Sequence, residues 1–333
     1  MVKRVLVTGK NGQLGQSLQK AVIQNSALTI QHSFSFVGRD ELDLACSESI
    51  SAFFSNQHFD AIINCAAYTA VDKAESEPEL ANQINHLAVA QLAGIAKLQR
   101  IPLIHISTDY VFNVQGGKPY VETDATDPQN VYGLTKLNGE KAMQASGCAG
   151  AIIRTSWVYS EFGNNFVKTM LRLGKERDSL NVIFDQIGSP TYAGDLAETI
   201  LQIIDHIVIA RSDSDVAIYE SGGGFKMDRY ATRSETSTLV LAMTEGEELT
   251  KNEIYHYSNE GICSWYDFAK AIFELSGISC QVNPIETREY PTPAKRPHYS
   301  VMNKTKIKQL PDLVIPYWRD SLCACLKELE VSK

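Results

Sequence analysis

Three glycines spaced three residues apart, directly after the first apolar run, constrain the fold of this chain more than any other feature. The run Arg4–Val7 is typical of a short buried strand, and the segment TGKNGQLG follows it. In such a junction Gly9 allows a tight turn, Gly12 lets the backbone approach a pyrophosphate and Gly15 permits close packing of the next helix on the strand. The N-terminus of that helix faces the anion. The segment therefore predicts a dinucleotide site, with a plain strand-to-helix turn as the alternative.

Short apolar runs alternate with amphipathic stretches over the first half of the chain. The predicted strands are Arg4–Val7, Ser35–Val37, Ala61–Asn64, Leu103–Ser107 and Ala151–Arg154. Apolar residues recur at three- and four-residue spacing between them. The predicted helices are Leu14–Ile23, Ser47–Ser55, Leu80–Leu98 and Tyr132–Ala145. This alternation predicts an α/β fold with a Rossmann-type doubly wound parallel sheet, whose ligands bind where the carboxyl ends of the strands meet.

The length of 333 residues allows about two domains. Prolines interrupt shorter elements in the second half, which predicts a smaller C-terminal substrate-binding lobe. The polar, turn-rich residues 211–253 predict an insertion or a mobile loop. The predicted division is an NAD(P)-binding domain of residues 1–165, to which residues 192–210 and 252–260 return, and a substrate-binding lobe of residues 166–191 and 261–333.

The composition excludes several classes of function. With 31 basic and 39 acidic side chains the net charge is −8, whereas a surface that binds nucleic acid or an anionic membrane carries a basic excess. No apolar stretch approaches the roughly 18 residues of a membrane span, and the N-terminal apolar run is too short for a signal peptide. The seven cysteines include no Cys-x-x-Cys pair, which is typical of a reducing compartment. We therefore expect a cytoplasmic protein that binds neither nucleic acid nor membrane.

The residues after the second predicted strand bear on the choice between NADPH and NADH. The sequence there is Val37-Gly38-Arg39-Asp40. An arginine at this place accommodates the 2′-phosphate of NADPH, whereas an acidic residue binds the ribose 2′-hydroxyl of NADH. Arg39 favours NADPH, but Asp40 stands beside it, so the cofactor is predicted as NADPH or NADH.

Tyr132 and Lys136 are the most informative pair for chemistry. They lie four residues apart, so a helix would place them on one face. A tyrosine with its ordinary pKa of about 10 is a poor acid–base group at neutral pH, and an adjacent ammonium lowers that pKa. Tyr132 would then exchange a proton with the carbonyl oxygen of a substrate. The hydroxyl of Thr108, at the end of a predicted strand, is expected to bind that same oxygen. A Tyr-x-x-x-Lys pair alone is a common surface feature, but after a glycine triplet it predicts proton delivery beside a nicotinamide.

Longer stretches resemble the extended short-chain dehydrogenase/reductases, and within that superfamily the enzymes that reduce nucleotide-linked 4-keto sugars. The matching stretches are GKNGQLG, NCAAYTAVDKAESEPELA, HISTDYVF, NVYGLTKLNGEKA, RTSWVY, GNNFVKTMLRL and YPTPAKRP. The resemblance implies reduction of a dTDP-4-keto sugar, dTDP-4-dehydro-L-rhamnose, to dTDP-L-rhamnose by hydride transfer from NAD(P)H. It also implies that Tyr132 donates the proton, that Lys136 holds the cofactor ribose and that Thr108 tunes the tyrosine.

The same resemblance assigns further ligand contacts. Predicted cofactor contacts are Gly12, Gln13, Leu14, Asp43, Leu44, Ala67, Tyr68 and Thr69, which join Gly9, Gly15, Arg39, Tyr132 and Lys136 in the expected cofactor site. Predicted substrate contacts are Val71, Thr108, Asp109 and Trp157, with Arg296 nearby. The place of Trp157 just past a strand also favours contact with a sugar or base, with core packing as the alternative.

Two departures from the superfamily pattern refine these expectations. Dehydratases of the superfamily follow the strand-end Thr-Asp with a glutamate that removes a sugar proton, whereas this chain has Tyr110, which favours simple reduction. Some members hold magnesium at a dimer interface through glutamates, but Ser17 stands in one expected acidic place, so magnesium is doubtful. The histidines do not have the spacing of metal ligands either, so we predict no metal site. The resemblance also leads us to expect a homodimer.

Two alternative functions stay open from the sequence. A few pocket side chains decide which sugar a reductase accepts, so the chain could reduce another nucleotide-linked 4-keto sugar. A non-catalytic regulatory subunit similar to the partner of methionine adenosyltransferase has the same glycine loop and tyrosine–lysine pair. The stretches TAVDKAE and RTSWVY favour the reductase over that subunit.

Overall fold

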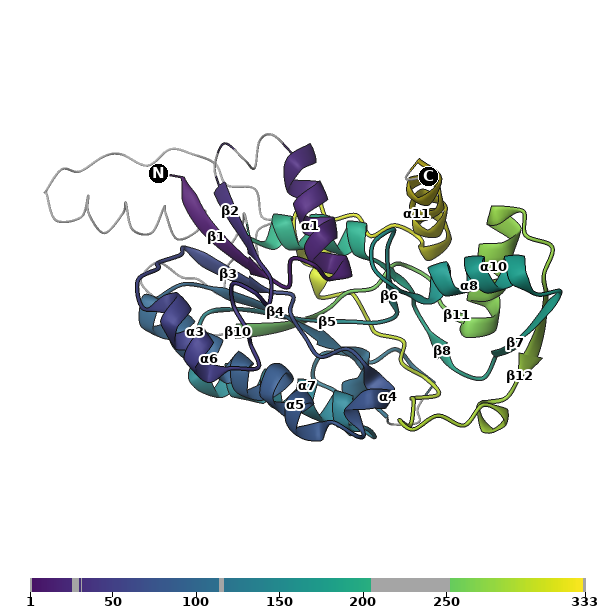
Figure 1. Ribbon diagram of the computed structural model, residues 1–333, viewed down its shortest axis with the longest axis horizontal. Coiled ribbons are helices and arrows are strands. Elements are labelled where there is room, and N and C mark those ends of the chain that lie inside the picture. The colour runs from purple at the N-terminus through teal and green to yellow at the C-terminus, as the bar shows by residue number, and fades with distance from the viewer. Residues whose placement is uncertain (1, 26–29, 31, 114–116, 205–251, 332–333) are drawn as a thin grey trace, which may run out of the picture.

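A six-stranded sheet with all strands parallel forms the centre of the protein in a computed structural model (Figure 1). The structure describes residues 2–25, 30, 32–113, 117–204 and 252–331. In spatial order the strands are β10 (Asn252–His256), β5 (Gly150–Thr155), β4 (Leu103–Thr108), β3 (Ala61–Asn64), β1 (Lys3–Thr8) and β2 (His32–Val37). The order reverses between β1 and β3, as in a doubly wound sheet. The predicted Rossmann-type fold is therefore confirmed.

Helices cover both faces of this sheet. The helices of this part are α1 (Gln13–Gln24), α3 (Ser47–Phe54), α4 (Val71–Ala74), α5 (Pro78–Asn82), α6 (Ala88–Gln99), α7 (Val131–Ser146) and a helix over 193–204. Successive strand residues point to opposite faces. Val5 and Val7 therefore pack with α1 and the helix over 193–204, whereas Leu6 packs with α3 and α6. This alternation explains why both faces are apolar and covered.

The single helix predicted over Leu80–Leu98 is divided in the structure. A π-helical turn, η1 (Gln83–Leu87), separates α5 from α6. The periodicity of the apolar residues did not reveal this turn, because one wider turn shifts the helix face by less than the width of an apolar stripe. Such π-turns are frequent near functional sites, and Asn85 within this one contacts a loop of the cleft described below.

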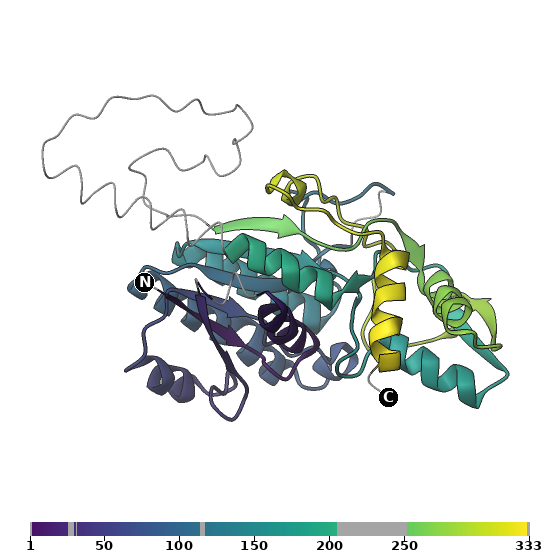
Figure 2. The same cartoon turned by 90° about the horizontal axis from the view of Figure 1, so that it is seen from above.

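The C-terminal lobe packs around an aromatic and aliphatic core of its own. Its strands pair as β6 (Val158–Tyr159) with β9 (Thr191–Tyr192), β7 (Ser179–Ile183) with β12 (Gln281–Ile285) and β8 (Ile187–Gly188) with β11 (Cys263–Ser264). Its helices are α8 (Phe166–Glu176), α10 (Trp265–Ser276) and α11 (Trp318–Val331). Figure 2 shows the yellow α11 beside α8 and α10. Short 3-10 turns in the described part of the chain are η2 (Asp109–Val111), η4 (Thr287–Glu289) and η5 (Ile307–Gln309).

Most of the predicted insertion over 211–253 lies outside the described residues. Its last two residues, Asn252 and Glu253, were placed in the insertion, but they are the first residues of β10. The segment 252–260 was also predicted to return to the sheet, and β10 lies in that segment and pairs with β5, whose residues are about a hundred positions away.

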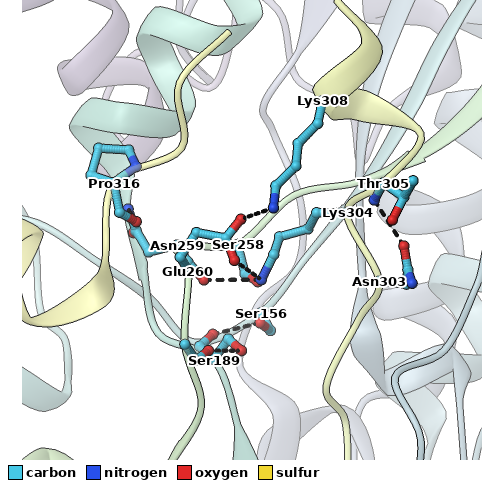
Figure 3. A network of polar contacts seen from close by, with 11 residues as sticks. Ser156, Ser189, Ser258, Asn259, Glu260, Asn303, Lys304, Thr305, Lys308 and Pro316 are labelled. Atoms are coloured by element: carbon cyan, nitrogen blue, oxygen red, sulfur yellow. Dashed lines mark hydrogen bonds and ion pairs between the residues drawn. The ribbon is translucent and has the colours of Figure 1, made fainter.

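A polar network that is buried at Ser258, Asn259 and Lys304 ties the last part of the chain to the end of β10 (Figure 3). The Lys304 amine is buried and donates to the Asn259 carbonyl at 3.2 Å and to the Ser258 hydroxyl at 3.4 Å. Glu260 lies 3.7 Å from Lys304 and 2.5 Å from Lys308, so one carboxylate balances two cations. These contacts fix the segment before η5 against the loop that follows β10. Within the described ranges, no helix is both long and apolar enough to cross a membrane.

Candidate active site

A cleft of about 890 Å³ runs along the carboxyl ends of the central strands. The predicted site residues that line it are Gly9, Gly12, Gln13, Leu14, Arg39, Asp43, Leu44, Ala67, Tyr68, Thr69, Val71, Thr108, Asp109, Tyr132, Lys136 and Trp157. Gly15 lies behind the glycine loop and Arg296 lies at the cleft edge, neither of them on its wall. The fold thus brings residues from nearly 150 positions of sequence into one elongated space.

The glycine loop is shaped as an anion cradle. Gly9 has a φ of 75°, and a Cβ there would lie 2.8 Å from the Ala66 nitrogen. A Cβ on Gly15 would lie 2.1 Å from the Gly9 carbonyl oxygen, so α1 can approach β1 only because this position has no side chain. Gly12 precedes α1, and no side chain caps the amide groups of the first helical turn. Free amides at a helix N-terminus bind phosphate, so these residues fit the pyrophosphate of a dinucleotide.

Gly15→Ala is expected to weaken NADPH and NADH binding and to lower stability by about 1–3 kcal/mol, because the added methyl group has no space. The matched control is Gly94→Ala in α6, where a Cβ meets nothing within 4 Å. That change is expected to raise stability by up to about 1 kcal/mol, since alanine is the better helix former. Thermal unfolding and fluorescence titration with each cofactor measure both effects. Wild-type binding and melting temperature in Gly15→Ala would contradict the cradle.

Local helix signals place Tyr132 and Lys136 on the cleft wall. The Asn130 side chain caps α7 by accepting a hydrogen bond from the Gly133 nitrogen at 2.7 Å. Gly133 also lets the helix pack closely, because a Cβ there would lie 2.4 Å from the Tyr110 carbonyl oxygen. Tyr110 then packs edge-on against the Tyr132 ring, with centroids 5.5 Å apart. The helix start is therefore fixed by two residues that flank the tyrosine.

We predicted that the Lys136 ammonium lowers the pKa of Tyr132, and this prediction is wrong for the structure. Burial raises the pKa of Tyr132 to about 12, opposed by a hydrogen bond with Thr108, and Lys136 is not among the groups that shift it. The Lys136 amine instead donates to the Ile106 carbonyl at 2.5 Å. Helical spacing places both residues on the cleft wall, but the long lysine side chain binds a backbone carbonyl of β4. Tyr132 is thus a protonated hydroxyl at neutral pH.

Thr108 and Asp109 follow β4 beside the tyrosine. The Thr108 hydroxyl donates to Asp109 Oδ1 at 3.1 Å and accepts from the Tyr110 nitrogen at 3.2 Å. Burial raises the pKa of Asp109 to about 6, opposed by hydrogen bonds from Ser300 and Thr108. Two titratable groups with raised pKa values, Asp109 and Tyr132, therefore line the same cleft.

Arg39 lies at the end of the cleft that the glycine loop forms. Its side chain is 74% exposed, and its Nε lies 3.3 Å from Asp43 Oδ2. Asp40 is exposed and does not line the cleft. The sequence left open whether Arg39 or Asp40 contacts the cofactor. In the structure Arg39 lines the cleft and Asp40 does not.

Trp157 has a left-handed backbone, with a φ of 48°, and stacks on Trp265 with ring centroids 3.6 Å apart. A Cβ on Gly188 would lie 2.7 Å from the indole Cε2, so the ring also fills the space of a missing side chain. Trp157 therefore packs against the C-terminal lobe and also lines the cleft, so its contact with a sugar or base stays a prediction.

Arg296 reaches the cleft edge through an ion pair. Its guanidinium donates to both carboxylate oxygens of Asp72 at 3.0 and 2.7 Å. The hydrogen bond from Arg296 holds the pKa of Asp72 below its ordinary value. Asp72 also accepts from the Ala294 nitrogen at 3.2 Å, which fastens the segment around residue 295 over α4. Because more than 200 positions separate the partners, no local pattern predicts this contact.

Two contacts that hold cleft residues in place were not predicted from the sequence. Asn85 in η1 holds the Tyr68 backbone through hydrogen bonds of 2.9 and 3.1 Å. Asn165, the N-cap of α8, donates to the Gln13 side chain at 2.8 Å and so joins the glycine loop to the C-terminal lobe. The sequence signal for Asn165 was its place before an amphipathic helix, which indicates a cap. Among the described side chains, no group of three His, Cys, Asp or Glu residues is arranged to hold a metal ion.

A parallel Rossmann sheet, a glycine cradle and a tyrosine–lysine helix on one cleft define an extended short-chain dehydrogenase/reductase. Comparison with known proteins narrows the class. The family described as RmlD substrate binding domain matches residues 3–233 and 231–331. The chain is 40% identical to a dTDP-4-dehydrorhamnose reductase of Escherichia coli strain K12, over 98% of this chain and 97% of that protein. This chain belongs to the RmlD family of dTDP-4-dehydrorhamnose reductases.

Solved structures agree with this assignment. A dTDP-4-dehydrorhamnose reductase from Clostridium acetobutylicum is 35% identical, with a TM-score of 0.79 over 98% of this chain and 99% of that one. A second, from Bacillus anthracis and in complex with NADP, is 33% identical, with a TM-score of 0.79 over 98% of this chain and all of that one (100%). The family likeness therefore extends over both lobes.

Proposed function

We propose that this protein reduces dTDP-4-dehydro-L-rhamnose to dTDP-L-rhamnose with NADPH. The observation that carries the proposal is that one cleft holds both the glycine cradle and the Tyr132–Thr108 pair. A nucleotide cofactor and a keto group would then lie side by side, as hydride transfer requires. Relatives that align with this chain over nearly their whole length are named dTDP-4-dehydrorhamnose reductase, which supports the same substrate.

The residues of the cleft have distinct roles in this proposal. NADPH, when bound, supplies the hydride that attacks the C4 carbonyl carbon. Tyr132 donates its phenolic proton to the carbonyl oxygen, and burial suits it to that role because it stays protonated at neutral pH. Thr108 holds the tyrosine oxygen in place through their hydrogen bond. Lys136 holds the cofactor ribose, as the family resemblance implies.

The remaining contacts divide along the cleft. The cofactor residues of the proposal are Gly9, Gly12, Gln13, Leu14, Asp43, Leu44, Ala67, Tyr68 and Thr69, with Gly15 shaping the loop from behind. The substrate residues are Val71, Asp109, Trp157 and Arg296. Arg39 supports NADPH over NADH, because its exposed guanidinium faces the end of the cleft and is able to bind a 2′-phosphate.

The test is the loss of NADPH and NADH absorbance, measured separately against dTDP-, UDP- and GDP-linked 4-keto sugars. We expect turnover with dTDP-4-dehydro-L-rhamnose and a higher kcat/KM with NADPH than with NADH. Faster turnover of another nucleotide sugar would assign that sugar as the substrate instead. No turnover across the panel, together with copurification of a synthetase, would favour the regulatory subunit.

A homodimer and a cytoplasmic location stay predictions. Leu87 of η1 and Leu134 of α7 are 45% and 48% exposed, and these two helical segments pack against each other. Apolar side chains on neighbouring helices are typical of subunit contacts, which supports a dimer through this side of the molecule.

A further inference from the structure

A buried row of polar side chains crosses the sheet beneath the cleft. The register pairs Thr8 of β1 with Asn64 of β3, and Asn64 with His105 of β4. The Thr8 hydroxyl lies 2.7 Å from Asn64 Oδ1, and Asn64 Nδ2 lies 3.1 Å from His105 Nδ1. All three side chains are at most 1% exposed. Since buried polar groups are costly unless paired, this row demands a defined direction for each hydrogen bond.

The direction of each bond follows from its first member. The Thr8 oxygen accepts from the Ala66 nitrogen at 3.3 Å, and its single hydrogen points to Asn64 Oδ1. The Asn64 amide therefore turns its NH₂ group toward His105. A nitrogen that accepts a hydrogen bond carries no proton, so His105 Nδ1 is bare and the proton of the neutral ring sits on Nε2.

This Nε2 atom faces Lys136. The distance between His105 Nε2 and Lys136 Nζ is 3.4 Å, while the amine donates to the Ile106 carbonyl at 2.5 Å. A neutral amine has a lone pair that accepts from Nε2–H, whereas an ammonium has only hydrogens to offer. The ring is neutral in either state of the lysine, because burial by itself holds the pKa of His105 well below its ordinary value and a charged Lys136 lowers it further. The contact therefore favours the neutral form of the lysine.

We propose that His105, held as the Nε2–H tautomer by Thr8 and Asn64, is a positioning residue that controls the proton on Lys136. The inference deepens the proposed function, since Lys136 belongs to that active site, but the tautomer and the lysine titration are measurable without substrate. The consequence for the reaction is that Lys136 exchanges its proton close to neutral pH rather than staying a permanent cation.

The other groups around Lys136 act in known directions. Burial lowers the pKa of Lys136 to about 8, and the nearby Glu140 and Cys65 oppose that shift. Glu140 lies on the same helix, its charge is paired with Arg154 of β5, and Cys65 follows β3. His105 is the facing group on β4. Only the contact with His105 depends on which ring nitrogen carries the proton, so changing the tautomer isolates its effect.

The first experiment determines the tautomer by ¹⁵N NMR of histidine-labelled protein, with the His105 signals assigned by their loss in His105→Phe. We expect a protonated Nε2 and an unprotonated Nδ1 between pH 6 and pH 8. A protonated Nδ1 or an imidazolium ring would overturn the proposal. The tautomer is measured in the wild-type chain. If His105→Phe folds poorly, the His105 signals are assigned by their shift in Asn64→Asp instead.

The second experiment follows Lys136 by ¹³Cε NMR of lysine-labelled protein, with Lys136→Arg identifying its signal. We expect a midpoint near pH 8 in the wild type. His105→Phe removes the donor and should raise that midpoint by about one unit. Asn64→Asp should raise it by more, because the added negative charge favours the ammonium and a carboxylate that accepts from Nδ1–H also turns Nε2 into an acceptor.

His58→Phe is the matched control, since His58 is exposed and distant in the fold from Lys136. It should leave the midpoint unchanged. An unchanged midpoint in folded His105→Phe would refute the role of His105. The basic limb of the kcat/KM profile should move with the midpoint, a shift that a purely structural histidine would not produce. A shifted midpoint in a protein with no reductase activity would leave this inference standing and defeat only the proposed function.

Discussion

Replacement of Tyr132 by phenylalanine is expected to lower kcat by about 10²–10⁴-fold, the range for loss of a positioned acid. The change removes one oxygen and keeps the ring, which packs edge-on against Tyr110. The glycine cradle is formed by residues between β1 and α1, which this change leaves intact, so the Kd for NADPH should be nearly unchanged. Steady-state turnover of dTDP-4-dehydro-L-rhamnose and fluorescence titration with NADPH measure the two effects separately.

The control is Tyr290→Phe, the same chemical change at a side chain that is 57% exposed. Its turnover should equal that of the wild type. Near-normal turnover in Tyr132→Phe would mean that another group delivers the proton. Asp109 would then be the first residue to replace, because its raised pKa of about 6 makes it the other acid on the same wall.

Arg154→Met is expected to destabilise the protein by about 3–5 kcal/mol, the usual effect of leaving a buried charge without its partner. Arg154 of β5 donates to both oxygens of Glu140 on α7, with Nη2 at 2.7 Å and Nε at 3.0 Å. The two side chains are 3% and 1% exposed, and Ser107 contacts the same carboxylate. This pair pins the helix that carries Tyr132 and Lys136 to the sheet. Urea unfolding at neutral pH measures the loss.

Arg172→Met supplies the matched control, because Arg172 and Glu176 form an exposed pair at 3.0 Å within α8. An exposed pair of this spacing contributes only about 0.3–0.5 kcal/mol. The double variant Glu140→Met with Arg154→Met should recover much of the stability, since no unpaired charge then remains. Equal losses in Arg154→Met and Arg172→Met would show that burial does not set the strength of this pair.

The parts of the fold that depend on local pattern were predicted closely. The strand predicted over Ala61–Asn64 is β3 with the same bounds, and the helix predicted over Ser47–Ser55 is α3 to within one residue. Apolar periodicity and helix caps act over a few residues, so the sequence displays them directly. The π-turn η1 was missed, because apolar residues continue on both sides of it and the pattern resembles that of one uninterrupted helix.

The candidate site shows the same division. Helical spacing placed Tyr132 and Lys136 on one face, and both line the cleft. The predicted effect of Lys136 on the pKa of Tyr132 was nevertheless wrong, because the Lys136 amine binds the Ile106 carbonyl. Which atom a long side chain reaches depends on the strand that the helix packs against, and that strand lies about 30 positions earlier in the chain.

The sequence by itself determined the class of fold, the glycine cradle and the residue types that carry the chemistry, since each is written in short-range spacing. Only the tertiary structure decided the partners of those residues. Arg296 binds Asp72, Trp157 stacks on Trp265, and His105 faces Lys136. The physical reason is that strand order and register bring together side chains from distant segments. Where the partners are buried, as His105 and Lys136 are, burial also shifts their pKa values.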